Sequence, residues 1–110
     1  DKVMVTDWPG DGPQKNRALA LTSHDWVLCL DADERVTPEL AREIQNLLDS
    51  TQCVGFDIPY QSTYCGHRIR FGDWRGEKHL RLFRKTKGQI SNHVVHCRIT
   101  LEGKKGLLRH

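Results

Sequence analysis

The sequence predicts an α/β fold, and two observations lead to that prediction. Apolar runs that suit strands alternate with segments at helical spacing, in the order strand, helix, strand, helix and then mainly strands. The chain has 110 residues, 37% of them hydrophobic, which is enough for one modest core. We therefore expect a single domain over residues 1–110, an α/β sheet with an irregular extension.

The first half is predicted to hold two strands and two helices. Residues 3–5 suit a short strand, and a helix is expected over residues 13–23, with a proline in its first turn. The segment "HDWVLCL", residues 24–30, has the apolar run of a strand covered on both faces. Thr37 suits the N-cap of an amphipathic helix over residues 38–49.

The second half is predicted to be mainly strands. In "CVGFDIPY", residues 53–60, apolar side chains alternate on one face, and Pro59 suggests an edge or a strand end. Residues 62–77, "STYCGHRIRFGDWRGE", suit a loop or lid with short extended pieces. Strands are expected at "KHLRLFRK", residues 78–85, and "HVVHCRITL", residues 93–101, and "EGKKG" then links to "LLRH".

Composition excludes some classes of protein and leaves others open. The net charge of +3, from 17 basic and 14 acidic residues, is mild and does not imply nucleic acid. Apolar runs of about five residues are too short for a membrane span. The four cysteines form no C-x-x-C pair, which disfavours a zinc ribbon and favours reduced thiols in the cytoplasm. With no initiator Met and a strand at its start, the chain is expected to be a fragment.

Three acids follow the apolar run that ends at Leu30. In an extended segment Asp31 and Asp33 project together, with Ala32 turned inward, and Glu34 only flanks them. Ligands of open α/β sheets bind beyond the carboxyl ends of strands. Paired carboxylates there suit Mg²⁺ or Mn²⁺, which bridge carboxylates to phosphates. The alternative is that "DADE" opens the next helix and interacts with its dipole.

These residues carry a family resemblance. The stretch "GPQKNRALALTSHDWVLCLDADERVTPEL" resembles the inverting family 2 glycosyltransferases of the GT-A (Rossmann-like) fold, and more narrowly the bacterial lipopolysaccharide core β-1,4-glucosyltransferases. The segments "GHRIRFGDW", "LRLFRK", "VVH" and "LLRH" also match, so the resemblance covers essentially the whole chain. It implies a partial nucleotide-diphospho-sugar transferase fold, truncated at the N-terminus, because nothing here matches the family's first strand and its Asn-Glu-Glu-like turn.

The resemblance implies donor-binding roles in the first half. Residues 1–50 would form the metal and nucleotide half, and residues 51–110 the acceptor side. Asp33 would be the principal metal ligand, and Asp31 would contact the sugar nucleotide and the metal. Lys15 and Asn16, with Gln14 less well supported, would lie on the helix that flanks the nucleotide. For Lys15 a solvated helix face is the alternative.

The resemblance also implies a catalytic base. Inverting transfer needs a carboxylate that takes the proton of the acceptor hydroxyl. The family carries Gly-Gly-Trp, two residues and then Asp, so Glu77 stands at the position of that Asp. Asp73 replaces the second Gly and is the second candidate for the base.

Other side chains have weaker support. The family shows His-Glu where this chain has His96 followed by Cys97, so His96 is either a third metal ligand or a structural histidine. Trp74 could stack on a pyranose and Arg81 could bind phosphate. Both could equally be ordinary packing or solvated residues.

The favoured hypothesis is therefore an enzyme, a metal-dependent glycosyltransferase. It would move glucose from UDP-glucose to a lipid-anchored lipopolysaccharide core sugar, with inversion. The expected setting is the cytoplasm, with peripheral contact at the inner membrane. The alternative is a non-catalytic truncated fragment, a module that binds sugars or a partner. Nucleic acid is not an expected partner, because the basic and aromatic loop holds no known RNA motif.

Overall fold

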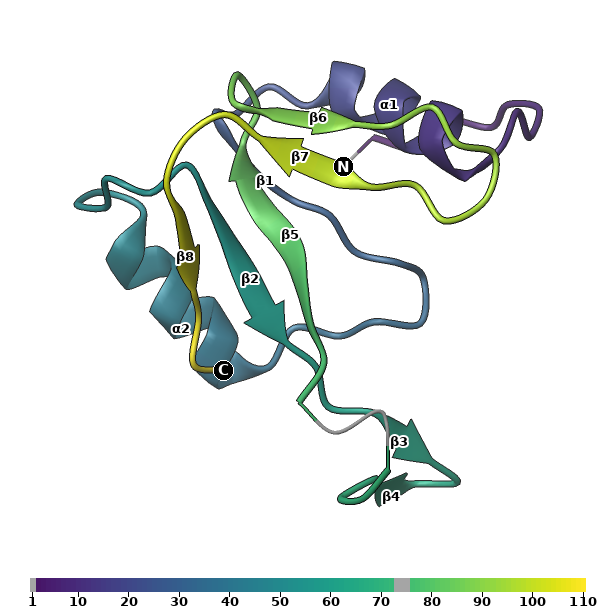
Figure 1. Ribbon diagram of the computed structural model, residues 1–110. Coiled ribbons are helices and arrows are strands. Elements are labelled where there is room, and N and C mark those ends of the chain that lie inside the picture. Colours follow the sequence, from purple (N-terminus) through teal and green to yellow (C-terminus); the bar gives the residue numbers. More distant parts are fainter. Residues whose placement is uncertain (1, 73–75) are drawn as a thin grey trace.

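A four-stranded mixed sheet forms the centre of the protein (Figure 1). The computed structural model describes residues 2–72 and 76–110. The strand order is β1 (Trp26–Leu28), β5 (Lys78–Arg84), β2 (Gly55–Pro59) and β8 (Lys105–Leu107). Strand β5 runs antiparallel to β1 and β2, and β8 runs parallel to β2. The C-terminal ends of β1, β2 and β8 therefore meet the start of β5 at one edge of the sheet.

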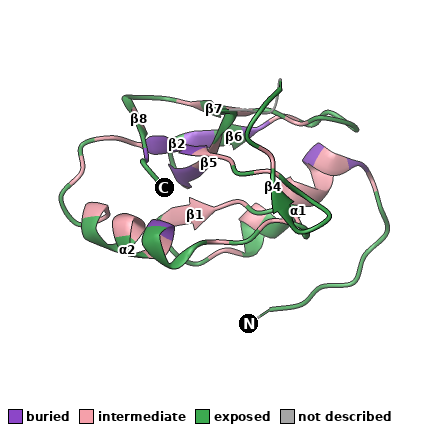
Figure 2. Cartoon of the chain, turned by 90° about the horizontal axis from the view of Figure 1, so that it is seen from below, coloured by how far each residue is buried: buried purple, intermediate pink, exposed green. Residues whose placement is uncertain are grey.

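Helix α2 (Pro38–Leu47) covers one face of this sheet and closes the core. As predicted, Thr37 caps it, because the Thr37 hydroxyl accepts a hydrogen bond of 3.1 Å from the Leu40 amide. Figure 2 shows that buried residues concentrate on β2 and β5. The core side chains are Leu40, Phe56, Ile58, Leu82 and Leu108.

The opposite face carries helix α1 (Asp11–Leu21) and the hairpin of β6 (Gly88–Ile90) and β7 (Ile99–Leu101) (Figure 1). Phe83, which is fully buried, points to this side and packs against Gly88, where an added Cβ would lie 2.2 Å from the ring. The amides that begin α1 donate to a loop near this hairpin. Asp11 N lies 2.8 Å from Val94 O, and Gly12 N lies 2.9 Å from His93 O. These bonds satisfy helix donors that have no partner within the helix.

The α/β prediction is confirmed, but three predicted strands differ. Residues 3–5 form no strand in the described part of the chain. Strand β1 is shorter than predicted and half-buried, because it is the outer strand of the described sheet. The strand predicted at residues 93–101 covers only β7. Its first part instead supplies carbonyls to α1, and His96 takes a left-handed backbone with φ 53°.

The predicted loop of residues 62–77 contains a small hairpin that projects from the edge of the sheet (Figure 1). Its strands are β3 (Thr63–Tyr64) and β4 (His67–Arg68), which confirms the expected short extended pieces. The predicted link at residues 102–106 instead includes the start of β8. In the described residues, no helix is long and apolar enough to cross a membrane.

We expect Gly12→Ala to destabilise the protein, by about 3 kcal/mol, through overpacking. A Cβ at Gly12 would lie 2.0 Å from the carbonyl oxygen of Ser91, so α1 would have to move. Helix propensity alone predicts the opposite sign, since Ala is favoured over Gly by about 1 kcal/mol inside a helix. Urea denaturation of the variant and the wild type measures the difference. A variant as stable as the wild type would contradict this packing.

Candidate functional site

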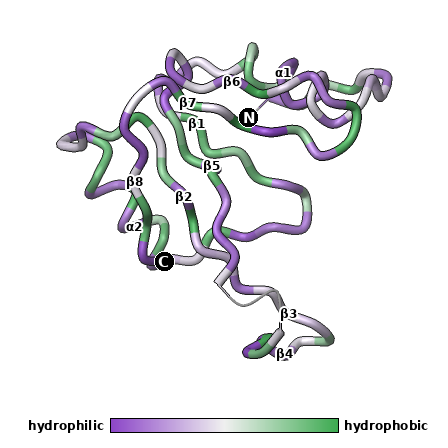
Figure 3. The backbone as a smooth tube through the Cα atoms, viewed as in Figure 1, coloured by the Kyte–Doolittle hydropathy of each residue, from purple (hydrophilic) through white to green (hydrophobic). Residues whose placement is uncertain are grey.

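The acids that follow β1 form a turn that closes on itself. The Glu34 amide donates to the Asp31 carbonyl at 3.0 Å, and Glu34 Oε2 accepts from the Asp31 amide at 2.8 Å. Figure 3 shows the apolar β1 run giving way to this hydrophilic turn. Ala32 is exposed. The expected extended segment with Ala32 turned inward is therefore wrong, because these two hydrogen bonds bend the chain between residues 31 and 34.

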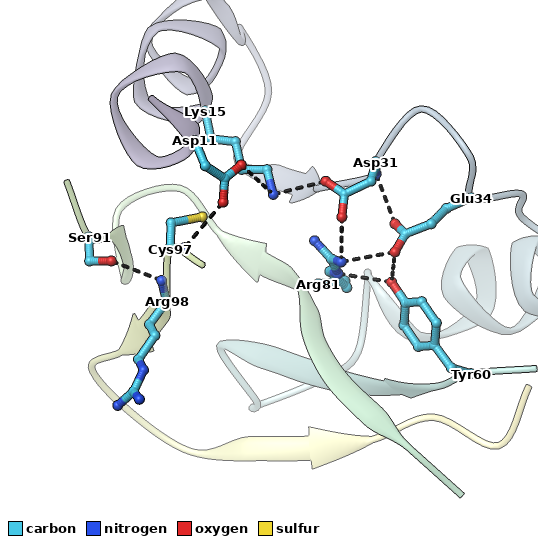
Figure 4. A network of polar contacts seen from close by, with 9 residues as sticks. All are labelled: Asp11, Lys15, Asp31, Glu34, Tyr60, Arg81, Ser91, Cys97 and Arg98. Atoms are coloured by element: carbon cyan, nitrogen blue, oxygen red, sulfur yellow. Dashed lines mark hydrogen bonds and ion pairs between the residues drawn. The ribbon is translucent and has the colours of Figure 1, made fainter. Parts of the chain in front are cut away.

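Arg81, in the middle of β5, lies at the centre of a charged cluster (Figure 4). Its Nη2 donates to Asp31 Oδ2 at 2.8 Å and to Glu34 Oε1 at 2.9 Å. Its Nε donates to the hydroxyl of Tyr60 at 2.9 Å, and that hydroxyl donates to Glu34. The Arg81 and Glu34 side chains are each only 15% exposed. The cluster therefore joins the turn after β1 to β5 and to the residue that follows β2.

Lys15 extends this cluster to helix α1. Its Nζ lies 2.8 Å from Asp31 Oδ1 and 3.2 Å from Asp11 Oδ1. Asp11 in turn accepts a hydrogen bond of 3.1 Å from the Cys97 amide. The Lys15 side chain is largely buried, so the alternative of a solvated helix face is wrong. We name the set Asp31, Glu34, Lys15, Tyr60 and Arg81 the Asp31 cluster.

The electrostatics of the Asp31 cluster favour its charged form. Burial on its own would raise the pKa of Asp31, but hydrogen bonds from Lys15 and Arg81 outweigh burial and hold that pKa below its usual value. Burial and the hydrogen bond to Glu34 raise the pKa of Tyr60 to about 12. At neutral pH the Tyr60 hydroxyl is therefore protonated, so it can accept from Arg81 and donate to Glu34. This arrangement holds both oxygens of Asp31 against cations.

The predicted metal ligands are not assembled into one group. Asp33 is exposed, and His96 is exposed in the bend before Cys97. Residues 2–72 and 76–110 contain no cluster of three or more His, Cys, Asp and Glu side chains placed to hold a metal ion. Asp33 forms no ion pair within the described residues, so its carboxylate is available to a ligand. It therefore still fits a hard cation, which can take one or two carboxylates and complete its coordination shell with water and phosphate. The metal roles of Asp31, Asp33 and His96 stay predictions.

Glu77, a predicted base, lies at the same edge of the sheet, directly before β5. Its carbonyl accepts a hydrogen bond of 2.8 Å from the Tyr60 amide. Its carboxylate is 45% exposed and lies 3.6 Å from His79 Nε2. The His79 ring stands edge-on to the Tyr60 ring, with centroids 4.8 Å apart. Asp73, the second candidate, lies outside the described residues, as does Trp74.

The remaining predicted residues point elsewhere. The Asn16 amide group donates to Ile90 O at 2.9 Å and to Asn92 Oδ1 at 2.8 Å, so it ties α1 to the end of β6. Gln14 bonds with Thr6. The nucleotide role of Asn16 stays a prediction, although its side chain already has two protein partners.

The sequence did not indicate Glu34 and Tyr60 as central residues. Glu34 appeared only to flank the paired acids, and Tyr60 only to continue the apolar alternation of its strand. One signal was available: a tyrosine directly after a strand-ending proline has one apolar side and one polar end at the sheet edge. Its partner across the strands could not be predicted, because Glu34 is 26 residues away in the chain.

We expect the Cys97 thiol to make stability depend on alkaline pH. Burial and the hydrogen bond to Asp11 raise the pKa of Cys97 from 9.0 to about 11. The neutral thiol is therefore favoured in the folded state, and its contribution is complete below pH 9 and lost as the pH rises through about 11. Denaturation of Cys97→Ala and wild type from pH 8 to about 11 tests this. The wild type should lose stability relative to the variant, and parallel curves would contradict the assignment.

The fold and the site define an α/β domain whose charged cluster lies beyond the carboxyl ends of its strands, where such domains bind ligands. The chain belongs to glycosyl transferase family 2, whose family model matches residues 2–103. This confirms the resemblance noted in the sequence.

Relatives extend the match over nearly the whole chain. The lipopolysaccharide core biosynthesis glycosyltransferase LpsC of Rhizobium meliloti is 32% identical over 110 residues, which is 98% of this chain and 41% of that protein. A TPR repeat-containing protein of Synechococcus elongatus is 35% identical over 66 residues, covering 59% of this chain and 16% of its own length. An uncharacterized glycosyltransferase of Rickettsia typhi is 34% identical over 83 residues, which is 74% of this chain and 26% of that protein. The chain thus spans less than half the length of these relatives, and no solved structure matches it.

Proposed function

We propose that the protein transfers a sugar from a nucleotide diphosphate sugar to a lipopolysaccharide core glycan, with inversion at the anomeric carbon. Membership of glycosyl transferase family 2 and the similarity to LpsC over 98% of the chain support this. The observation that carries the proposal is the Asp31 cluster, which gathers ionised groups at the edge where β1 and β2 end. Glucose is the proposed sugar and UDP-glucose the proposed donor.

On the donor side, cations and carboxylates lie together. Lys15 and Arg81 are fixed against Asp31 and carry positive charge that suits a diphosphate. Asp33 offers an exposed carboxylate for Mg²⁺ or Mn²⁺, with Asp31 beside it. When bound, the ion would supply charge stabilisation for the leaving diphosphate. His96, in the loop between β6 and β7, is proposed as a third ligand only on the family pattern.

On the acceptor side, Glu77 is the proposed base, with Asp73 second. The acceptor oxygen forms a bond to the anomeric carbon while the bond from that carbon to the diphosphate oxygen breaks. The hydroxyl proton passes to the Glu77 carboxylate, and the electron pair of the broken bond stays with the diphosphate. The carboxylate is exposed enough to meet a substrate hydroxyl. The proposed acceptor is a lipid-anchored core sugar at the cytoplasmic face of the inner membrane, met by peripheral contact.

The test is a transfer assay with the intact protein, UDP-glucose, Mn²⁺ and a lipopolysaccharide core oligosaccharide. Mass spectrometry should detect one added hexose, and NMR should show a β linkage formed from the α-linked donor. EDTA should abolish the product, and Asp49→Ala, which changes an exposed acid after α2, should retain it. An α-linked product would contradict inversion. No product with any donor or acceptor would favour the non-catalytic module.

A further inference from the structure

A polar pocket of about 390 Å³ lies between the end of β2 and the β3–β4 hairpin. Its size is in the range of small-ligand sites. A hydrogen bond of 2.9 Å from the Ile69 amide to the Ser62 carbonyl closes the base of the hairpin. The pocket walls therefore come from two segments that are fixed to one another. They include Tyr60, Ser62, Arg68, Arg70, Phe71 and Gly76.

The charge of this pocket favours an anion. The described residues that line it include two arginines and no acid. Arg68 and Arg70 form no ion pair within residues 2–72 and 76–110. Guanidinium groups present paired donors that match carboxylate and phosphate. Two guanidiniums in one concave site, without an acid partner among the described residues, therefore suit a ligand that carries a negative group.

An aromatic side chain beside the arginines favours a sugar. Phe71 lines the pocket and is 82% exposed, although it is a large apolar ring. Such a ring can cover the apolar face of a pyranose and lose its contact with water. Charge from the arginines and apolar contact from Phe71 together match a sugar that bears a phosphate or a carboxylate.

The pocket shares the residue Tyr60 with the Asp31 cluster. Tyr60 lines the pocket, and its hydroxyl forms hydrogen bonds with Arg81 and Glu34. The Tyr60 amide donates to the carbonyl of Glu77, and Gly76 of the pocket is the neighbour of Glu77 in the chain. A ligand in this pocket would therefore lie close to the backbone of Glu77, the proposed base.

We infer that this pocket is an acceptor subsite that binds the negatively charged group of an anionic sugar through Arg68 and Arg70, with Phe71 against the ring. The acceptor role of the pocket rests on the proposed function, whereas its binding of an anionic sugar does not. Phosphate and carboxylate are the two sources of the charge that the test separates.

The binding test uses NMR titration of the intact protein with glucose 6-phosphate, glucuronate, methyl glucoside and inorganic phosphate. We expect both anionic sugars to bind about tenfold or more tightly than methyl glucoside. The double variant Arg68→Gln and Arg70→Gln should lose about tenfold in affinity for the anionic sugars. Arg68→Gln alone should lose part of that affinity. Arg98→Gln, an exposed arginine beyond β6, is the matched control and should bind as the wild type does. Circular dichroism checks that each variant folds.

Three results would overturn the inference. Equal affinity for methyl glucoside would exclude recognition of charge, and equal affinity for inorganic phosphate would exclude recognition of the sugar. An equal loss in the Arg98→Gln control would show a general effect of net charge. Preference for glucose 6-phosphate over glucuronate would assign the charge to phosphate, and the reverse to carboxylate. Phe71→Ala should weaken binding of both sugars and leave inorganic phosphate unchanged.

Transfer assays separate this inference from the proposed function. With an active enzyme, the double variant should raise the acceptor KM about tenfold and leave kcat and the donor KM near the wild-type values. An unchanged acceptor KM would overturn the subsite while the transferase activity stands. Conversely, loss of all transfer with retained binding of anionic sugars would overturn the proposed function and leave the binding site intact.

Discussion

Glu77→Gln is expected to reduce turnover by about a hundredfold or more, which is the range for loss of a positioned general base. The substitution keeps the shape of the side chain but removes the group that accepts the proton. Donor binding should stay near normal, because the Glu77 carboxylate forms no hydrogen bond or ion pair with the Asp31 cluster, and only the Glu77 backbone carbonyl bonds to Tyr60. Steady-state kinetics and donor calorimetry on the same preparation measure both quantities.

Glu102→Gln is the matched control for this substitution. Glu102 is an exposed acid in the turn between β7 and β8, so the variant should retain wild-type turnover. A fully active Glu77→Gln enzyme would remove Glu77 as the base. Asp73→Asn would then be expected to lose activity by the same factor.

We expect Arg81→Ala to lower the free energy of unfolding by about 3 kcal/mol, the range for breaking a largely buried ion pair. The loss would leave Asp31, Glu34 and the Tyr60 hydroxyl without their shared cation. Glu34 would lose its ion-pair partner in a site where its side chain is only 15% exposed. Urea denaturation at neutral pH measures the change.

Arg84→Ala gives a control in the same strand. Arg84 pairs with Asp25, whose side chain is half exposed, and lies over the Trp26 ring at 4.7 Å from its centroid. We expect a loss of about 1 kcal/mol, as for solvent-accessible pairs. Equal losses in the two variants would show that the Asp31 cluster contributes no more than a surface ion pair.

Local signals predicted the elements of the fold that depend on neighbouring residues. The Thr37 cap, the alternation through Phe56 and Ile58, and the short extended pieces at β3 and β4 all follow from short-range patterns. The errors have a common physical cause. Residues 93–96 have the composition of a strand, but distant α1 amides donate to the carbonyls of His93 and Val94, and no local pattern reports such a partner.

The candidate site was predictable to a similar extent. A run of acids after an apolar strand indicated Asp31, and the Gln-Lys-Asn segment indicated Lys15, which does reach it. The cross-strand partners could not be predicted, since Arg81 is 50 residues from Asp31 and its side chain could equally have been solvated. The turn at residues 31–34 was also missed, because alternation along a strand says nothing about where that strand ends.

We propose that the acids after β1 bind a nucleotide sugar through a divalent metal ion. Calorimetry of the intact protein with UDP-glucose, with and without Mn²⁺, tests it most directly. We predict Mn²⁺-dependent binding that Asp33→Ala abolishes and that Asp49→Ala leaves unchanged. Binding by Asp33→Ala that keeps the affinity and the metal dependence of the wild type would contradict the claim.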